Sequence, residues 1–202
     1  MTRPALILAS TSRYRRELLL RLRLPFSVEA PGVDETARDG ETPADLARRL
    51  ALEKAQAVAV RHPHAVVIGS DQVADLDGLA LGKPGTHERA LQQLQLMRGR
   101  RVVFQTAVAV VRHDSGHAGQ DLAAVAVTFR DLDNAEIEHY LRTETPYDCA
   151  GSARSESLGI ALLSAIDSDD PTALVGLPLI RTCRLLREAG LDPLRVDSEA
   201  HS

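Results

Sequence analysis

Short apolar runs alternate along the chain with amphipathic segments, and this alternation predicts strands and helices in turn. Beyond Pro43, Leu46, Leu50, Lys54 and Val58 lie four apart, which is typical of a helix with one buried face. The pattern predicts strands at residues 5–9, 26–30, 65–70, 101–112 and 122–130. It predicts helices after Ser12, from Pro43, up to about Met97, over 133–142 and over 178–189.

The segments between these elements indicate how the strands pair. Asp77-Gly78 is a strong signal for a two-residue hairpin turn, and the turn 113–119 makes the two long runs around it an antiparallel pair. Strands that alternate with helices, together with this pair, predict an α/β fold. We expect a mixed twisted sheet with flanking helices and two lobes around a cleft. We expect one domain over 1–202, with 191–202 as a loose tail.

The overall charge excludes a protein that holds a long nucleic acid through a basic surface. The chain has 202 residues and a formal net charge of −4, so a polyanionic ligand would need a local basic site. Cys149 and Cys183 are the only cysteines and lack the spacing of zinc ligands. No apolar run reaches the roughly 20 residues of a membrane helix, and the N-terminal run is too short for a secretion signal. We therefore expect a cytoplasmic protein without a membrane partner.

Lysine is rare in this chain, and the two lysines present are informative. Of the 24 basic residues only Lys54 and Lys83 are lysines. A coding bias towards arginine explains the general excess, and chance alone could have kept two lysines. A lysine retained under such a bias indicates a position that needs a compact ammonium group rather than a planar guanidinium. Both lysines fall in the segments richest in motifs.

The polar segment 10–16, Ser-Thr-Ser-Arg-Tyr-Arg-Arg, lies where a predicted strand passes into a helix. Free backbone N–H groups and the helix dipole make such a junction favourable for an anion, and hydroxyl and guanidinium groups would add bonds to phosphate. The same residues would also serve as a helix cap with a solvated outer face. The segment 78–83, GLALGK, lacks the glycine spacing and the following Ser or Thr of a P-loop.

Three carboxylates stand out beside these basic residues. Asp34 and Glu35 lie in the predicted loop 31–42, and Asp71 follows the apolar run 65–70. Carboxylates that reach one cleft from different segments are what Mg²⁺ uses, usually together with substrate phosphates. Surface acids are common, so Asp34 is a weaker candidate than Asp71, which we expect at the end of a strand.

The chain resembles the Maf family of nucleoside triphosphate pyrophosphatases from about residue 5 to residue 190. Six segments carry the resemblance, namely LILASTSRYRRELL, APGVDE, ALEKA, IGSDQV, LGKP and CAGSARSESLGIALL. The resemblance implies an inosine triphosphatase-like fold of the Maf/Ham1 type and a divalent metal cofactor, Mg²⁺ or Mn²⁺. It also implies that a small nucleoside triphosphate is cut between its α and β phosphates to release pyrophosphate, and it is compatible with a homodimer.

The resemblance also implies roles for individual residues. Asp71 would accept the proton of the attacking water, and Glu35 and Asp71 would lie at the metal. Four further positions match the family's phosphate-binding residues, namely Ser10, Arg15, Lys54 and Lys83. Neutralising the charge of the triphosphate is the main task in phosphoryl transfer.

Three positions resemble the branch of the family that acts on 7-methyl-GTP, namely Tyr14, Gln72 and Glu156. Methylation makes guanine cationic, and an aromatic face attracts a cation, while a carboxylate accepts hydrogen bonds from guanine N–H groups. Tyr14 stands where tryptophan is frequent in that branch, and Arg13 stands where many members have proline. The alternatives are a house-cleaning pyrophosphatase for other modified or pyrimidine nucleotides such as dTTP and UTP, or a nucleotide-binding regulator of septum formation.

Overall fold

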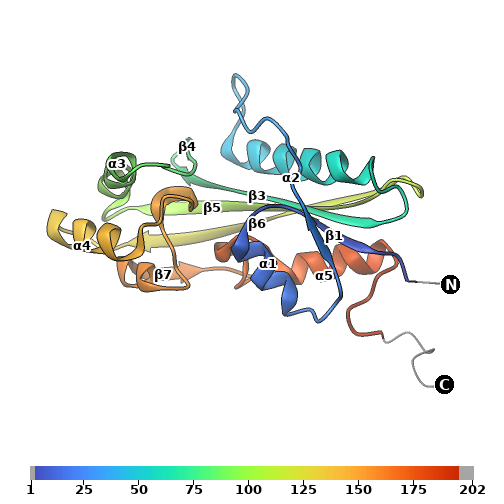
Figure 1. The fold of residues 1–202 in the computed structure, drawn as a ribbon. Helices are drawn as coiled ribbons and strands as arrows, with labels where there is room; N and C mark the ends of the chain where they lie inside the picture. The colour runs from blue at the N-terminus through green and yellow to red at the C-terminus, as the bar shows by residue number, and fades with distance from the viewer. Residues whose placement is uncertain (1–2, 196–202) are drawn as a thin grey trace.

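A mixed sheet of seven strands runs the length of the molecule and carries helices on both faces (Figure 1). The strand order is β2-β1-β3-β5-β6-β7, and β4 pairs with β3. The computed structural model describes residues 3–195. The strands are β1 (Leu6–Ala9), β2 (Ser27–Glu29), β3 (Val66–Leu76), β4 (Leu79–Leu81), β5 (Arg101–Arg112), β6 (His117–Phe129) and β7 (Leu163–Asp167). The predicted α/β class and mixed sheet are confirmed.

Five α-helices surround the sheet, and each follows a local signal in the sequence. They are α1 (Arg13–Leu20), α2 (Pro43–Ala59), α3 (His87–Met97), α4 (Asn134–Glu144) and α5 (Leu179–Glu188). Side chains at the N-caps of the first four accept a backbone N–H of the first turn, which satisfies donors that have no partner inside a helix. Pro43 occupies the first position of α2, where its missing N–H costs nothing.

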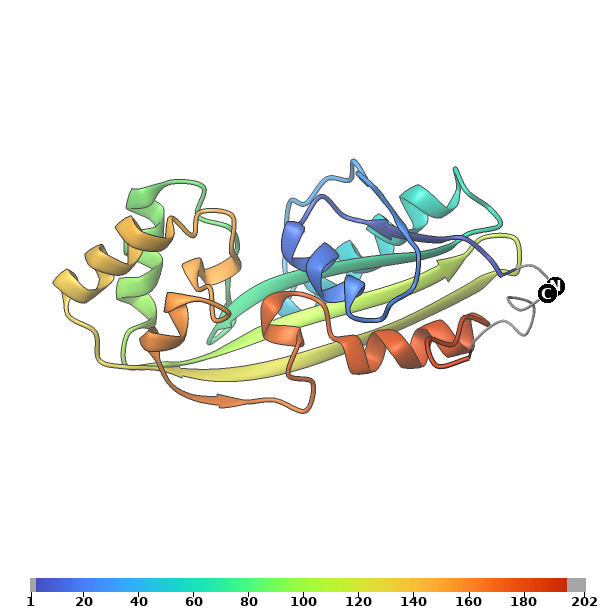
Figure 2. The same cartoon turned by 60° about the horizontal axis from the view of Figure 1, so that its bottom comes forward.

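The molecule has two lobes joined by the long strands β3, β5 and β6 (Figure 2). One lobe holds α1, α2 and α5, and its apolar side chains pack on both faces of the sheet. The other lobe holds α3 and α4 and has its own apolar cluster, which includes Phe104, Phe129 and Ile137. The predicted two-lobed architecture is therefore present. Within residues 3–195, no helix combines the length and apolarity needed to cross a membrane.

The residues of β3 contact different segments of the chain on the two faces of the sheet. A Cβ atom on Gly69 would lie 2.2 Å from the carbonyl oxygen of Ala51, so α2 packs directly against the backbone of the strand. Ser70 and Gln72 point the other way and bond to the segment 173–176. Because successive side chains of a strand alternate between faces, Asp71 faces α2, as does Gly69.

Several boundaries differ from the predicted ones. The strand predicted at 65–70 continues to Leu76, so Asp71 lies in the middle of a strand and not at its end. The last strand of the hairpin begins at His117, five residues before the predicted start. The strand β7 and three short 3-10 helices, η1 (Ala150–Ser152), η2 (Leu158–Leu162) and η3 (Ala173–Val175), were not predicted.

Two further predictions concern the hairpin turn at residues 77–78 and the C-terminal tail. Asp77 and Gly78 have φ values of 50° and 89° and connect β3 to β4 as the predicted two-residue hairpin turn. Leu191, where the loose tail was predicted to begin, is buried in the core beside α5. Packed chain therefore extends beyond the predicted start of the tail, and residues 196–202 lie outside the described part.

Candidate active site

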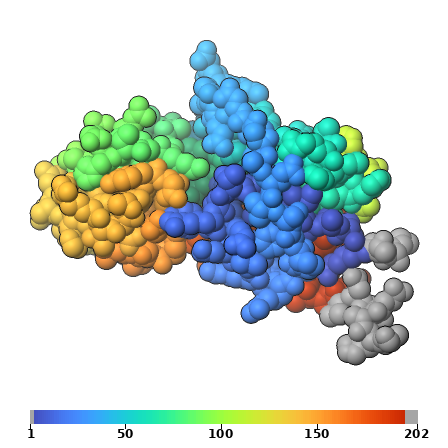
Figure 3. All heavy atoms as spheres, in the orientation of Figure 1, coloured from blue at the N-terminus to red at the C-terminus, as the bar shows by residue number. Residues whose placement is uncertain are grey.

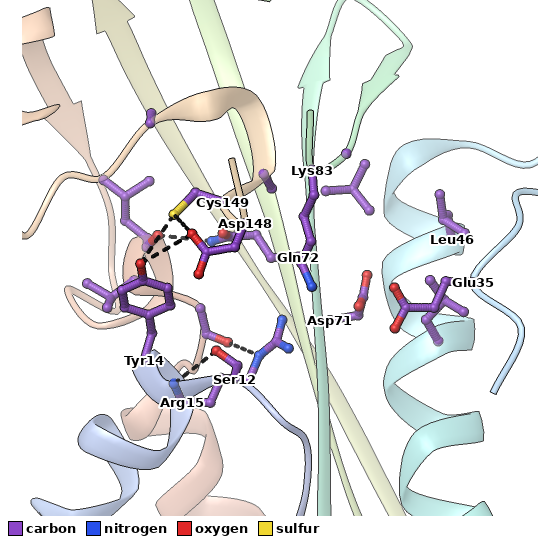
Figure 4. Close-up of a pocket in the computed structure, with 18 of the residues that line it drawn as sticks. Ser12, Tyr14, Arg15, Glu35, Leu46, Asp71, Gln72, Lys83, Asp148 and Cys149 are labelled. Carbon is purple, nitrogen blue, oxygen red and sulfur yellow. Dashed lines mark hydrogen bonds between the residues drawn. The ribbon is translucent and has the colours of Figure 1, made fainter. Parts of the chain in front are cut away.

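Two adjoining pockets open at the waist between the lobes, and Figure 4 shows residues that line the first of them. Their volumes are about 410 Å³ and 460 Å³. The first extends between the lobes to Gln72 and Glu156, and the second lies against the turn after β1 and reaches Lys54. Both are lined by Ser12, Tyr14, Arg15, Glu35, Lys83 and Asp148. Most residues predicted from the sequence thus converge on one connected space.

At the bottom of this space a lysine holds two carboxylates. The Nζ atom of Lys54 lies 2.6 Å from Oδ1 of Asp71 and 2.6 Å from Oε1 of Glu35. Lys54 is only 4% exposed and Asp71 only 7%. A buried ammonium group is stable only when it is paired, and α2 and β3 supply this pair because they pack so closely at Gly69.

Glu35 reaches the same lysine from the loop between β2 and α2, which projects from the surface in Figure 3. Its side chain remains 52% exposed. Burial alone would raise the pKa of Glu35, but the hydrogen bond from Lys54 and the charges of Lys54 and Lys83 outweigh it and hold the pKa below its ordinary value. Glu35 is therefore ionised at neutral pH.

Arg15 lies in the first turn of α1 and points into the pocket. Its Nε donates to the carbonyl oxygen of Gly176 at 2.9 Å, which fixes the guanidinium against the segment that follows β7. Burial lowers the pKa of Arg15, and the opposite charges of Asp71 and Glu35 counteract this effect. The guanidinium therefore lies within the electrostatic reach of both carboxylates.

The serines at the start of α1 meet both roles predicted for this segment, a helix cap and a lining of the pocket. Ser12 caps the helix, since its Oγ accepts the backbone N–H of Arg15 at 3.4 Å. Ser10 is 4% exposed, and its Oγ accepts the N–H of Ser12 at 3.1 Å. Ser10 and Thr11 line the second pocket with Arg13 and Arg15, so the capped helix start also faces the space that a phosphate would enter.

Lys83 enters the site from the other lobe, just after β4. Its side chain extends towards the side of the pocket where Asp71 and Glu35 lie (Figure 4). Among residues 3–195 no hydrogen bond or ion pair of its ammonium group is found. The three basic groups predicted to bind phosphate, Arg15, Lys54 and Lys83, thus surround one space from α1, α2 and the segment after β4.

The three predicted selectivity residues line the first pocket. The amide nitrogen of Gln72 donates to Thr106 Oγ1 at 2.9 Å and lies 3.0 Å from two carbonyl oxygens of η3, so its carbonyl oxygen is the group left for a ligand. Glu156 keeps an exposed surface, but the groups around its carboxyl partly desolvate it, which raises the pKa of this carboxyl. Tyr14 binds Arg13, Arg154 and Asp148 through its hydroxyl.

The structure does not bring every candidate into the site, and it adds residues that the sequence analysis missed. Asp34 folds back on its own loop, where it accepts bonds from Thr36, and it does not line either pocket. Asp148 and Arg154 were not predicted. Arg154 lies within the segment CAGSARSESLGIALL, but its contact with Tyr14 spans 140 residues of sequence, which no local pattern indicates.

The site offers oxygen ligands suited to a metal that also binds substrate. Within the described residues no group of three or more His, Cys, Asp and Glu side chains is arranged to hold a metal ion. Asp71 and Glu35 are the two carboxylates that lie 2.6 Å from the Nζ atom of Lys54. Mg²⁺ is usually held by one or two carboxylates together with waters and substrate phosphates, so these residues fit such an ion but not a metal caged by protein alone.

Comparison with known proteins gives the relationships of the chain. Residues 5–189 match the family described as Maf-like protein. A protein of Albidiferax ferrireducens named 7-methyl-GTP pyrophosphatase is 69% identical over 94% of this chain and 95% of its own length. A protein of Polaromonas with the same name is 71% identical over 92% of this chain and 85% of its own length. One from Bordetella pertussis, also so named, is 59% identical over 95% of each.

A solved structure of a HAM1 protein from Coxiella burnetii is similar to part of the chain, with a TM-score of 0.45 and 14% identity over 64% of this chain and 75% of that protein. The family match covers nearly the whole chain, including every site residue described above. The identity to the curated relatives extends over the same length. The chain therefore belongs to the Maf-like protein family.

Proposed function

We propose that this protein hydrolyses 7-methyl-GTP to 7-methyl-GMP and pyrophosphate. The observation that carries the proposal is the buried Lys54, paired with Asp71 and Glu35 at the bottom of a pocket that Arg15 and Lys83 also line. Relatives at 59–71% identity are named for this activity. A nucleotide triphosphate needs several cations around its phosphates, and this pocket supplies them despite the negative net charge of the chain.

The phosphates occupy the second pocket in this proposal. Ser10 and the start of α1 provide a hydroxyl and backbone N–H groups, and Arg15 provides a guanidinium held by Gly176. Lys54 and Lys83 neutralise the charge that develops on the bridging oxygen, which leaves with pyrophosphate. The carbonyl of Gly176 holds Nε of Arg15, which leaves the two terminal nitrogens for phosphate oxygens.

Asp71 is the proton acceptor in this proposal. Lys54 binds its Oδ1, which orients the carboxylate and leaves Oδ2 as the oxygen for a water molecule. The water oxygen attacks the α-phosphorus, its proton passes to Asp71, and the bond from the α-phosphorus to the bridging oxygen breaks. Pyrophosphate leaves with the electron pair of that bond.

A divalent cation completes the proposed site. Asp71 and Glu35 are the residues that would hold it, in agreement with their shared position around Lys54. When bound, such an ion supplies positive charge to the phosphate oxygens. Glu35 lies on a projecting loop and is half exposed, so its carboxylate is open to an ion that arrives with the substrate.

The base occupies the first pocket. Glu156 lies there with no side-chain partner among the described residues, and its carboxylate suits the N1–H and amino group of a guanine. The carbonyl oxygen of Gln72 is a second acceptor. Pyrimidines do not present two adjacent donors in this arrangement, so the pocket favours a purine of the guanine type.

The test is a panel of 7-methyl-GTP, GTP, dTTP, UTP and CTP with Mg²⁺ or Mn²⁺, in which pyrophosphate and orthophosphate are assayed separately. We expect pyrophosphate release to be fastest with 7-methyl-GTP. A preference for dTTP or UTP would overturn the assignment of Glu156 and Gln72 and retain the reaction. Absence of turnover on every nucleotide would refute the proposed reaction.

A further inference from the structure

Tyr14 already has two cationic partners in this protein. The guanidinium carbon of Arg13 lies 4.7 Å from the centre of its ring, and that of Arg154 lies 5.4 Å from it. Both arginines also donate to its hydroxyl. The ring attracts a cation through a limited negative potential, so two guanidinium groups beside it offset the attraction for a cationic base.

Arg154 is fixed in this position from the opposite lobe. Its Nη1 donates to Oε2 of Glu144 at 2.9 Å, and its backbone N–H donates to the hydroxyl of Tyr140 at 3.0 Å. The side chain is 16% exposed. A guanidinium held in this way cannot swing aside to make room for a second positive charge on Tyr14.

Asp148 supplies negative charge at the same place. Its carboxylate lines both pockets and points towards Tyr14 (Figure 4). It is 57% exposed, and its contacts are long: 3.4 Å to the hydroxyl of Tyr14, 3.5 Å to Cys149 and 4.0 Å to Arg154. The carboxylate of Asp148 is therefore paired more weakly within the protein than that of Glu144, which binds Arg154 closely.

Two carboxylates balance the charges of the two arginines around Tyr14. Arg13 and Arg154 contribute two positive charges, and Asp148 and Glu144 contribute two negative ones. Without the carboxylate at 148, the surroundings of the ring have a net positive charge and repel a methylated, cationic guanine. An unmethylated guanine carries no charge at neutral pH, so this positive charge weakens its binding little.

We propose that Asp148 is a specificity-determining residue that selects the cationic base over its neutral counterpart. The proposal rests on the function proposed above, because it concerns the same pocket and the same substrate. In this proposal a carboxylate on the opposite lobe, rather than the ring of Tyr14, recognises the positive charge of the base.

The experiment compares kcat/KM for 7-methyl-GTP and for GTP in the wild type and in Asp148→Asn. We expect the ratio of the two values to fall about tenfold in the variant. Asp148→Glu, which keeps the charge, retains the ratio to within about threefold. Asp131→Asn is the matched control, since it removes one charge from an exposed position of the same lobe outside both pockets, and its ratio equals that of the wild type.

Binding of 7-methyl-GMP and GMP, measured by calorimetry in the same proteins, separates this proposal from the proposed function. If the wild type does not hydrolyse 7-methyl-GTP, the proposed function fails, and the ratio of the two dissociation constants decides the role of Asp148. A ratio within twofold of wild type in Asp148→Asn refutes the role in both assays. An equal loss for the methylated and unmethylated nucleotides also refutes it, because that result describes a general binding residue.

Discussion

Lys54 combines three properties that an arginine cannot reproduce. It is almost fully buried, its single nitrogen lies 2.6 Å from two carboxylates, and α2 lies so close to β3 that the side chain has little room. A guanidinium is planar and wider, and it spreads its donors over several nitrogens. Substitution by arginine would therefore separate Asp71 from Glu35.

We expect Lys54→Arg to lower kcat/KM for 7-methyl-GTP by at least about 100-fold, because the displaced carboxylates no longer face the phosphates. Pyrophosphate release measures the effect. Arg48→Lys, the reverse exchange on the exposed side of the same helix, serves as the control and keeps wild-type kinetics. Wild-type kinetics in Lys54→Arg would disprove the need for an ammonium group.

Asp71→Asn tests the proton acceptor. The substitution keeps the size of the side chain and removes its basicity, so we expect kcat to fall by at least about 100-fold, the usual scale for the loss of a general base. Thermal unfolding followed by circular dichroism shows whether the variant is folded. Near-normal turnover in a folded Asp71→Asn protein would rule out this role.

At the scale of single residues, the sequence predicted the cations of the site better than their neighbours. The rarity of lysine singled out Lys54 and Lys83, and both line the pockets. Asp34 was predicted beside Glu35, but in a loop neighbouring side chains diverge, and Asp34 bonds to Thr36 instead. The surroundings of Tyr14 could not be predicted, because they depend on segments that meet only in the folded protein.

Arg49 of α2 anchors the loop between β2 and α2 to the helix. Arg49 donates to the two carboxylate oxygens of Glu41 at 2.6 and 2.8 Å and to the carbonyl oxygen of Thr36 at 3.0 Å. This two-point bond fixes the loop beside Glu35. The hydrogen bonds from Arg49 lower the pKa of Glu41 from 4.5 to about 2.

This anchor predicts a pH dependence of stability. The unfolded chain takes up a proton at Glu41 near pH 4.5, whereas the folded protein does so only near pH 2, so this stabilisation is present above pH 4.5 and is lost as the pH falls towards 2. We expect Glu41→Gln to unfold more easily at pH 7 and to show a smaller loss between pH 4.5 and 2, by urea denaturation. Asp39→Asn, at an exposed position in the same loop, is the control; an unchanged pH profile in Glu41→Gln would contradict the anchor.

The contact of α2 with β3 leaves no space for a side chain at Gly69. A Cβ there would lie 2.6 Å from the backbone nitrogen of Ala55 as well as 2.2 Å from Ala51. We expect Gly69→Ala to cost about 1–3 kcal/mol of stability and to lower kcat/KM, since α2 carries Lys54. Gly82→Ala, where a Cβ meets nothing within 4 Å, is the control for stability. Equal melting temperatures of Gly69→Ala and wild type would show that α2 and β3 can separate here without loss of stability.

At the scale of elements, the sequence predicted those with a clear apolar period. The helices α2, α4 and α5 and the strand β5 lie where the pattern placed them. The strand β3 was predicted too short because polar residues in its middle resemble a strand end, while in the fold they are paired across both faces. The strand β7 is mostly exposed, so its sequence has no apolar alternation to detect.

The molecule as a whole has two lobes but one continuous sheet. The cores of both lobes include side chains of β3 and β5, so neither lobe can lose these strands without disrupting the other. We propose on this basis that the chain folds as a single domain. The active-site pockets lie where the shared strands pass from one lobe to the other.

Continuity of the sheet predicts a single unfolding transition. We expect pyrophosphate release, far-UV circular dichroism and tyrosine fluorescence to be lost at the same urea concentration. The tyrosines lie at positions 14, 140 and 147 and report on the waist and on the second lobe. Activity that disappears well before the circular dichroism signal, or two separate transitions, would show that the lobes unfold independently.

The alternation of β3 has a consequence for how such a protein evolves. Asp71 faces α2 and Lys54 and is the proposed proton acceptor, while the next residue, Gln72, faces the opposite side of the strand and is a proposed selectivity residue. Substitutions on one side of this strand can therefore change which nucleotide is accepted while the hydrolytic residues stay constant. We expect gene duplication followed by such exchanges to give one ancestral hydrolase descendants that accept different nucleotides.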